Sequence, residues 1–158
     1  MSYLLDSNIF IKCKHEMPMD IFQGFWQRLA MLAQTGLIFS CEKVKEEIEK
    51  GNDDLNQWCK DNLPEGFFLP FDAYAEYSRL MSWANNNPIF KTTARQEFAT
   101  VADAFIVAMA AVHHMKVVTF ETSDPKCKKR VKIPDACMAI GVEFCSLNDL
   151  LHSLSVVI

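Results

Sequence analysis

Four acidic residues that lie far apart in the sequence occupy positions from which carboxylates could act together: Asp6, Glu47, Asp103 and Glu121. Asp6 follows the short apolar run 3–5, and Glu121 ends the run that begins at residue 116. If both runs are strands of an open parallel sheet, their carboxyl ends meet at one edge, where such sheets gather ligands. The sequence therefore predicts two carboxylates at the same edge.

The neighbours of Asp6 leave two interpretations open. Ser7 and Asn8 are small and polar, so they could orient the carboxylate by hydrogen bonding and start the next helix. The plainer interpretation is that Asp6 is only the N-cap of that helix.

Asp103 is the single carboxylate in the nearly apolar stretch 98–112. It shares a helix face with the apolar residues three, four and seven positions later. An ionised carboxylate buried without partners costs several kcal/mol even after relaxation, so this one must be paired, neutral or bound to a cation. An ion pair with Arg95 is the alternative to a functional role.

Glu47 lies in a charged helix expected from Ser40, its predicted N-cap, to Lys50. Val44 shares its apolar face, which makes Glu47 a candidate for the same site. A salt bridge to Lys43 is the competing explanation.

A cluster of these four acids could not stay ionised unaided. Two unit charges ~4 Å apart repel each other by about 4 kcal/mol at an effective dielectric constant near 20. Mg²⁺ and Mn²⁺ relieve such repulsion through oxygen ligands, and Mg²⁺ also binds substrate phosphates. The chemistry that such a site favours is metal-assisted hydrolysis of a phosphodiester.

Apolar periodicity predicts the elements that must position these acids. Strands are expected at 3–5, 37–39, 116–121 and 142–145, and helices at 21–33, 40–50, 53–62, 71–83, 98–113, 133–140 and after Ser146. Strands that alternate with helices, without tight hairpin signals, indicate an α/β fold with a mainly parallel sheet. The length of 158 residues indicates one domain, 1–158.

Composition narrows the protein class. The longest apolar run, 104–112, has nine residues against the roughly 20 of a membrane-spanning helix. The first residues lack the basic and then apolar pattern of a secretory signal, so we expect none. We therefore expect a cytoplasmic protein without membrane partners.

The six cysteines form no C-x-x-C pair, which favours reduced thiols over a zinc site. A net charge of −4 means that any nucleic-acid binding must rest on a local patch or a metal.

The acidic segments resemble, in order, the motifs of the PIN domain. The segments are 4–11 (Leu-Leu-Asp-Ser-Asn-Ile-Phe-Ile), Val44-x-x-Glu47-Ile48 preceded by Ser40, 102–110, and 117–121 with its Thr119-x-Glu121 pattern. Each motif is weak alone, but the four in this order are fairly specific. The length and the segment 133–137 (Ile-Pro-Asp-Ala-Cys) are similar to a PIN-like subfamily near the VapC-type toxins.

This resemblance implies a three-layer α/β/α sandwich with a central, mainly parallel sheet over residues 1–158. It also implies a Mg²⁺- or Mn²⁺-dependent endoribonuclease, commonly the toxin of a prokaryotic toxin–antitoxin pair. The implied partners are an RNA substrate, a cognate antitoxin protein and a second copy of the chain.

Carried over by position, Asp6 and Asp103 would be the main metal ligands, and Glu47 would help to position the attacking water. Glu121 matches the fourth acidic position, where many relatives carry Asp or Asn and a further Asp downstream. Asp124 or Asp135 is open to that downstream role. The supporting hydrogen-bonding residues would be Ser7, Asn8, Thr119 and Asp135.

A basic stretch follows Glu121 and contains Lys126, Lys128, Lys129 and Arg130. Together with the cations at 12–15, it could hold an RNA backbone beside the acidic pocket. A solvated loop is the alternative.

Two other functional classes compete with the nuclease. A non-catalytic RNA- or protein-binding regulatory module on the same scaffold would suit the acidic net charge. A phosphoacceptor domain would also place Asp6 at a strand end, but the usual acidic pair is missing. A phosphotransfer hydrolase with an Asp-x-Asp motif is disfavoured because residue 8 is Asn.

Overall fold

The centre of the protein is a five-stranded sheet in which every neighbouring pair of strands is parallel. In this computed structural model, which describes residues 1–158, the strands are β1 (Tyr3–Leu5), β2 (Ile38–Cys41), β3 (Phe68–Leu69), β4 (Lys116–Val118) and β5 (Phe144–Cys145). Their order across the sheet is β3-β2-β1-β4-β5. The strand interiors are short apolar runs because helices cover both faces.

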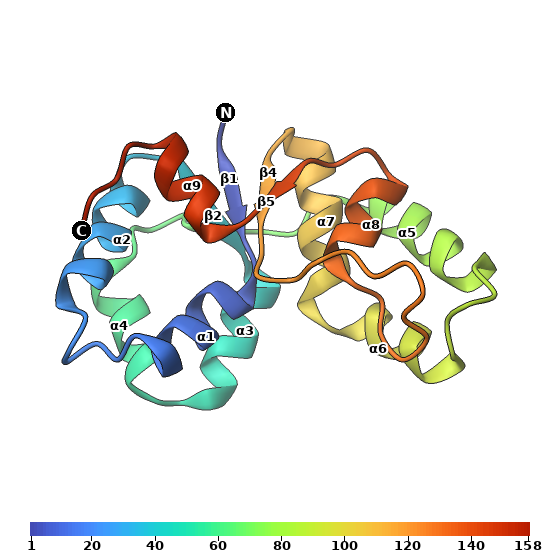
Figure 1. Cartoon of the computed structure of the whole chain (residues 1–158), viewed down its shortest axis with the longest axis horizontal. Helices are drawn as coiled ribbons and strands as arrows, with labels where there is room; N and C mark the ends of the chain where they lie inside the picture. The colour runs from blue at the N-terminus through green and yellow to red at the C-terminus, as the bar shows by residue number, and fades with distance from the viewer.

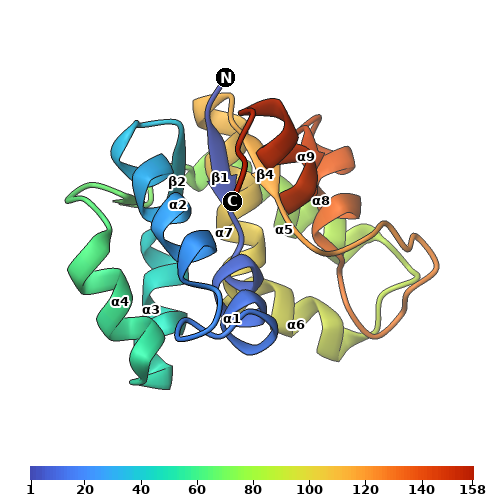
Figure 2. The same cartoon turned by 60° about the vertical axis from the view of Figure 1, so that its left-hand side comes forward.

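Helices form a layer on each side of this sheet (Figures 1 and 2). The first layer contains α1 (Ser7–Glu16), α2 (Gln23–Gln34), α4 (Asp54–Asn62) and α9 (Leu147–Ser153). The second contains α5 (Tyr74–Asn86), α6 (Thr92–Thr100), α7 (Ala102–His113) and α8 (Ile133–Ala139). The remaining helix, α3 (Glu42–Gly51), contacts α1 and α4 as well as α7. The predicted three-layer α/β/α architecture is confirmed.

The strand order reverses between β1 and β4, the two neighbours at the middle of the sheet. Leu5 pairs with Val118, and the N–H of Asp6 donates to the carbonyl of Val118 at 3.0 Å. The residues that follow these two strands therefore leave the sheet side by side. Ligands of open α/β sheets bind outside such a switch point.

The helix predicted over 98–113 is instead two helices. Val101 has an extended backbone (φ −84°, ψ 166°), so it ends α6 and serves as the N-cap of α7. The break places Asp103 in the first turn of a new helix rather than within a long one. The strand predicted at 116–121 is also shorter and ends at Val118, while the two-residue strand β3 was not predicted.

Ser40 is not the N-cap of α3, as the sequence had suggested. It lies in β2, and its buried hydroxyl donates to the carbonyl of Leu5 at 2.8 Å, which ties β2 to the end of β1. The N-cap position belongs to Cys41. The predicted cap at Ser146 is confirmed, since Ser146 and Asp149 form a reciprocal capping box.

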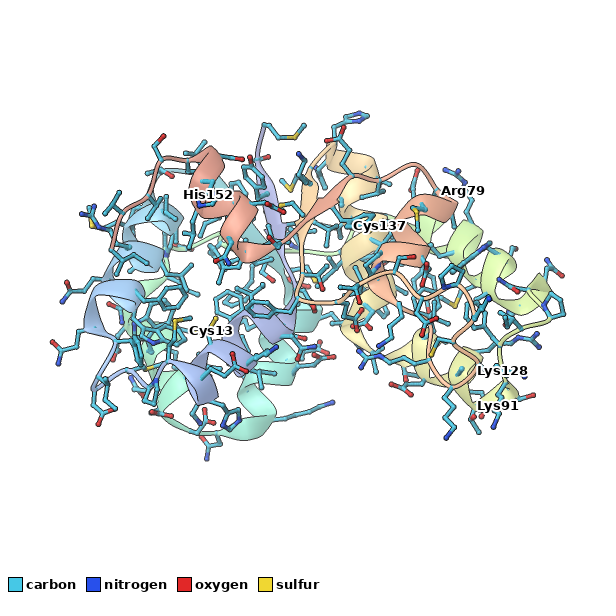
Figure 3. All side chains as sticks on the ribbon, in the orientation of Figure 1. Cys13, Arg79, Lys91, Lys128, Cys137 and His152 are labelled. Atoms are coloured by element: carbon cyan, nitrogen blue, oxygen red, sulfur yellow. The ribbon has the colours of Figure 1, made fainter.

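All six cysteines are free thiols, as predicted. Cys13 and Cys137 are buried in the two different helical layers (Figure 3), and burial raises the pKa of each thiol to about 12. None of the nine helices combines the length and apolar composition needed to cross a membrane.

Candidate active site

The fold brings the four predicted acids to the carboxyl edge of the sheet. Asp6 follows β1 directly and Glu121 lies in the segment after β4, while Asp103 sits in the first turn of α7 and Glu47 on α3. In Figure 1 this edge is the lower end of β1, where the chain turns into α1. Helices that lead back into a parallel strand begin at this same edge, which explains why α7 delivers its first turn here.

Asp6 is completely buried and is held by two hydroxyl groups. Thr119 Oγ1 donates to its Oδ2 at 3.1 Å, and Ser7 Oγ donates to its Oδ1 at 3.3 Å. Burial, followed by the negative charges of Asp103 and Glu121, raises the pKa of Asp6 to about 7. At neutral pH the carboxyl group of Asp6 is therefore close to its pKa. The surrounding negative charges favour a cation at this position.

The two interpretations of Asp6 do not exclude each other. Asp6 does occupy the N-cap position of α1, but its side chain makes no capping hydrogen bond of normal geometry. Its carboxylate is directed to Thr119 and Ser7 instead.

Asp103 is buried beside a cation, but the cation is not Arg95. Nη2 of Arg130 donates to Asp103 Oδ2 at 3.2 Å, whereas Arg95 donates to the carbonyl of Asn87 at 2.7 Å. Burial and the charge of Glu121 raise the pKa of Asp103 to about 6, although Arg130 acts in the opposite direction. Asp103 is therefore close enough to the other acids to be repelled by them.

Glu121 is buried between a helix terminus and the same arginine. Its Oε2 accepts from the N–H of Ile133, the first residue of α8, at 2.7 Å. Its Oε1 lies 2.8 Å from Nη2 of Arg130, an ion-pair contact without the alignment of a hydrogen bond. Glu121 thus joins the acidic group through charge while it also caps α8.

Glu47 caps α7 in a similar way. Its Oε1 accepts from the N–H of Ala102 at 2.9 Å, one residue before Asp103. The competing salt bridge with Lys43 is absent, because Lys43 pairs with Glu46 at 3.5 Å and lies over the ring of Phe105. The charge of Glu47 contributes to the raised pKa of Asp103, so the two carboxylates are neighbours.

Asp135 is bonded to the loop that follows Glu121 and not to the other acids. Its Oδ1 accepts from Ser123 Oγ at 2.6 Å and its Oδ2 from the N–H of Asp124 at 2.9 Å. Asp124 itself is exposed, and Asn8 is half-buried on α1 without a side-chain hydrogen bond. Both oxygens of Asp135 are therefore used to fix the loop.

A family model described as "Domain of unknown function (DUF4411)" matches residues 3–158. The chain belongs to the DUF4411 family. No curated protein matches this DUF4411 sequence.

Among solved structures, the DUF4411 chain is similar to one in the crystal structure of VapBC2 from Rickettsia felis bound to a DNA fragment from their promoter. The two are 16% identical, with a TM-score of 0.55 over 92% of this chain and 98% of the other. It is also similar to a chain in the structure of FitAB bound to an IR36 DNA fragment. Here the identity is 19% and the TM-score 0.53, over 91% and 94% of the two chains. These likenesses confirm the PIN-like fold of the DUF4411 domain.

The cations in the basic loop of the DUF4411 domain have two different orientations: the lysines face the solvent, and the arginine faces the acids. Lys126, Lys128 and Lys129 are exposed, and the carbonyl of Lys128 accepts from the N–H of Lys91 on the α6 side at 3.0 Å. Figure 3 shows Lys91 and Lys128 together at the outer end of this loop. Arg130, predicted as part of the RNA-binding stretch, instead turns its guanidinium to Asp103 and Glu121.

A fifth acid near this arginine was not predicted from the sequence. Glu97 of α6 lines a small hollow with Asp103 and Arg130, and its charge helps to raise the pKa of Arg130. The available signal was helical spacing, since Glu97 lies three residues after buried Ala94 and four before Val101.

The donor chemistry of the site suits a hard divalent cation, because every candidate ligand is a carboxylate or hydroxyl oxygen. Glu121 Oε1 in particular is buried without a hydrogen-bond donor. As packed here, however, no group of three or more His, Cys, Asp or Glu side chains is arranged to hold a metal ion. Arg130 contacts two of the four acids. The oxygen atoms of the four acids therefore suit a divalent ion by their chemistry, but their present arrangement does not.

The larger hollows of the DUF4411 domain lie elsewhere. One of about 350 Å³ is bounded by α3, α4 and the segment leading into β3, and another of about 360 Å³ by α2 and the C-terminal tail. Neither contains any of the four acids. The acidic site is distinguished by its charges and its position at the switch point, not by its size.

Proposed function

We propose that this DUF4411 protein is a metal-dependent endoribonuclease that hydrolyses RNA phosphodiester bonds. The observation that carries the proposal is the convergence of Asp6, Glu47, Asp103 and Glu121 at the switch point of the sheet. The pKa values of Asp6 and Asp103, about 7 and about 6, support it because part of each increase comes from neighbouring carboxylates. Such mutual repulsion is what a divalent cation relieves.

Each residue has a separate task in this proposal. Asp6 and Asp103 would hold Mg²⁺ or Mn²⁺, which supplies a Lewis acid and charge neutralisation when bound. Thr119 and Ser7 orient the carboxylate of Asp6 by donating to its two oxygens. Glu47 is held at Oε1 by the first N–H of α7, and its other oxygen would help to position the attacking water.

The partners are proposed from the fold and the charge distribution. The exposed cations Lys126, Lys128 and Lys129 would bind the RNA backbone beside the acids. The two similar solved structures are complexes named VapBC2 and FitAB on DNA fragments, which supports a role as the toxin of a type II toxin–antitoxin pair. We accordingly propose a cognate antitoxin as a partner, a second copy of the chain as a further one, and the cytoplasm as the site of action.

The test compares the wild-type protein with Asp6→Asn and Asp103→Asn, which keep side-chain size but remove the charge. Degradation of a structured RNA should require Mn²⁺ or Mg²⁺ in the wild type and be lost in both variants, as should growth inhibition on expression. Asp20→Asn, an exposed acid outside the site, is the control. Full activity of both site variants, with melting curves that show intact folds, would refute the assignment.

A non-catalytic RNA- or protein-binding module is the second candidate. The pairing of Arg130 with Asp103 and Glu121 favours it, since an internal cation already contacts two of the four acids. Calorimetric titration of the metal-stripped protein with Mn²⁺ separates the two. Binding supports the nuclease, and the absence of binding supports the module.

A further inference from the structure

Arg130 sits in the acidic site in an unusual manner for a structural arginine. Its contacts to both Asp103 Oδ2 (3.2 Å) and Glu121 Oε1 (2.8 Å) come from the same atom, Nη2. Its Nε is buried without a hydrogen-bond partner. The strong form of an arginine–carboxylate pair uses two parallel hydrogen bonds from the planar guanidinium, and that form is absent here. Arg130 thus supplies charge to the site with little of the geometry that makes such pairs tight.

Arg130 fills the space beside the acids and is itself partly exposed to solvent. The hollow that it lines with Glu97 and Asp103 is too narrow to admit a water molecule, so the side chain itself occupies the space beside the acids. The arginine side chain is 39% exposed, whereas those of Asp103 and Glu121 are 8% and 9% exposed. It reaches the site from the loop between β4 and α8. The exposed carboxylate of Glu97 offers a second partner outside the acid pair.

We infer that Arg130 is a built-in, displaceable counter-ion of the acidic site, which a divalent cation must move aside in order to bind. This inference rests on the proposed function, because it assumes that the acids bind such a cation. It explains how Asp103 and Glu121 can be buried next to each other, since one cation contacts both. Arg130 would therefore compete with a cation for the acidic site. The fraction of sites that hold a cation would depend on the cation concentration.

The experiment measures Mn²⁺ binding by calorimetry in metal-stripped wild type, Arg130→Met and Lys129→Met. Met retains much of the apolar stem but removes the charge. Lys129→Met removes an equal charge from the adjacent exposed residue. Arg130→Met should bind Mn²⁺ about tenfold more tightly than the wild type, because a positive charge within ion-pairing distance no longer opposes the ion. Lys129→Met should bind with an affinity close to that of the wild type.

Metal-free Arg130→Met should also melt at a lower temperature than the wild type, and saturating Mn²⁺ should remove the difference. A second measurement, in the wild type itself, does not depend on how the variant folds. The NMR signal of the Arg130 Nε–H, assigned by its absence in Arg130→Lys, should shift as Mg²⁺ saturates the protein.

The outcomes separate this inference from the proposed function. If wild type and Arg130→Met bind Mn²⁺ equally well, or the variant binds more weakly, Arg130 is not a competing counter-ion, although the nuclease proposal stands. An Arg130 signal unchanged at saturating Mg²⁺ would have the same meaning. If neither protein binds Mn²⁺ and the wild type cleaves no RNA, the cation site itself is refuted and this inference falls with it.

Discussion

Thr119 Oγ1 lies 3.1 Å from Asp6 Oδ2 and joins residues that are 113 positions apart in the sequence. The same hydroxyl accepts from the N–H of Glu121 at 3.1 Å. One side chain thus links the end of β1 to the loop after β4 that carries the fourth acid. The register of β1 with β4, in which Leu5 faces Val118, brings these groups together.

Removing the hydroxyl of Thr119 should lower the stability of the fold and raise the pKa of Asp6. Thr119→Val leaves a buried carboxylate without one of its donors, so we expect a loss of about 1–3 kcal/mol in the free energy of unfolding. The pKa of Asp6 should rise further, because the bond to Thr119 lowers it. Urea unfolding at pH 8 measures the first effect, and carboxyl NMR titration the second. Thr119→Ser retains the hydroxyl and should behave like the wild type; equal losses in both variants would point to packing instead.

The stability of the metal-free protein should fall as the pH rises from about 4 to about 7. Asp6 and Asp103 have pKa values of about 7 and about 6 in the folded protein, against the ordinary value of 3.8 for an aspartate. Over this range the folded state holds protons that the unfolded state has released, so each increase in pH favours unfolding. Asp6→Asn should match the wild type near pH 4 and become more stable than it near pH 7.

This pH dependence is measured by urea unfolding in the presence of a chelator, with Asp20→Asn as an exposed control. Saturating Mn²⁺ should flatten the wild-type profile, since a bound cation stabilises the ionised acids. Parallel profiles for the wild type and Asp6→Asn would show that Asp6 titrates normally.

Two substitutions at Glu47 should separate its structural role from its charge. Glu47→Gln keeps an oxygen that can accept from the N–H of Ala102, so stability should be unchanged or slightly higher. Glu47→Ala removes that acceptor at the start of α7 and should cost about 1 kcal/mol. Both should lower RNA cleavage if the negative charge matters. Normal cleavage by Glu47→Gln, with thermal melting as the structural control, would confine Glu47 to its capping role.

Asp135 should prove to be a positioning residue rather than the fourth metal ligand. Asp135→Ala removes the acceptors for Ser123 and Asp124, so amide exchange in the segment 121–124 should become faster. Mn²⁺ affinity should change little, while cleavage should fall because Glu121 is less well placed. Asp124→Ala is the matched control, since its side chain is exposed. Loss of Mn²⁺ binding in Asp135→Ala alone would instead identify it as a ligand.

The three outward lysines should account for much of the salt dependence of RNA binding. Replacing Lys126, Lys128 and Lys129 with serine should weaken binding and reduce the slope of log K against log salt by up to about 2, from roughly 0.7 per phosphate contact on single strands. Binding is measured with the Asp103→Asn protein so that RNA stays intact. The control replaces three exposed cations on helices away from this loop, Arg28, Lys50 and Lys60. Equal effects of both triple variants would mean that no localised RNA surface exists.

Apolar periodicity was sufficient to predict the fold class and the placement of Asp6. A buried run of three residues followed by an acid, in a chain where strands alternate with helices, leaves few alternatives to a carboxylate at the edge of a parallel sheet. The same local logic placed Glu47 and Asp103 on the inner faces of their helices. These predictions depend on residues only a few positions apart, which secondary structure fixes directly.

Hydrogen-bond and ion-pair partners from distant parts of the chain could not be predicted from local sequence spacing. The sequence offered Arg95 and Lys43 as counter-ions because they are near Asp103 and Glu47 along the chain. In the folded structure Asp103 pairs with Arg130, and Glu47 accepts from the N–H of Ala102. Likewise, Ser40 had the residue type of a helix cap but became a link between two strands. Which donors and charges meet is decided by sheet register and by the path of the 119–132 loop, because buried polar groups must find partners wherever the packed chain provides them.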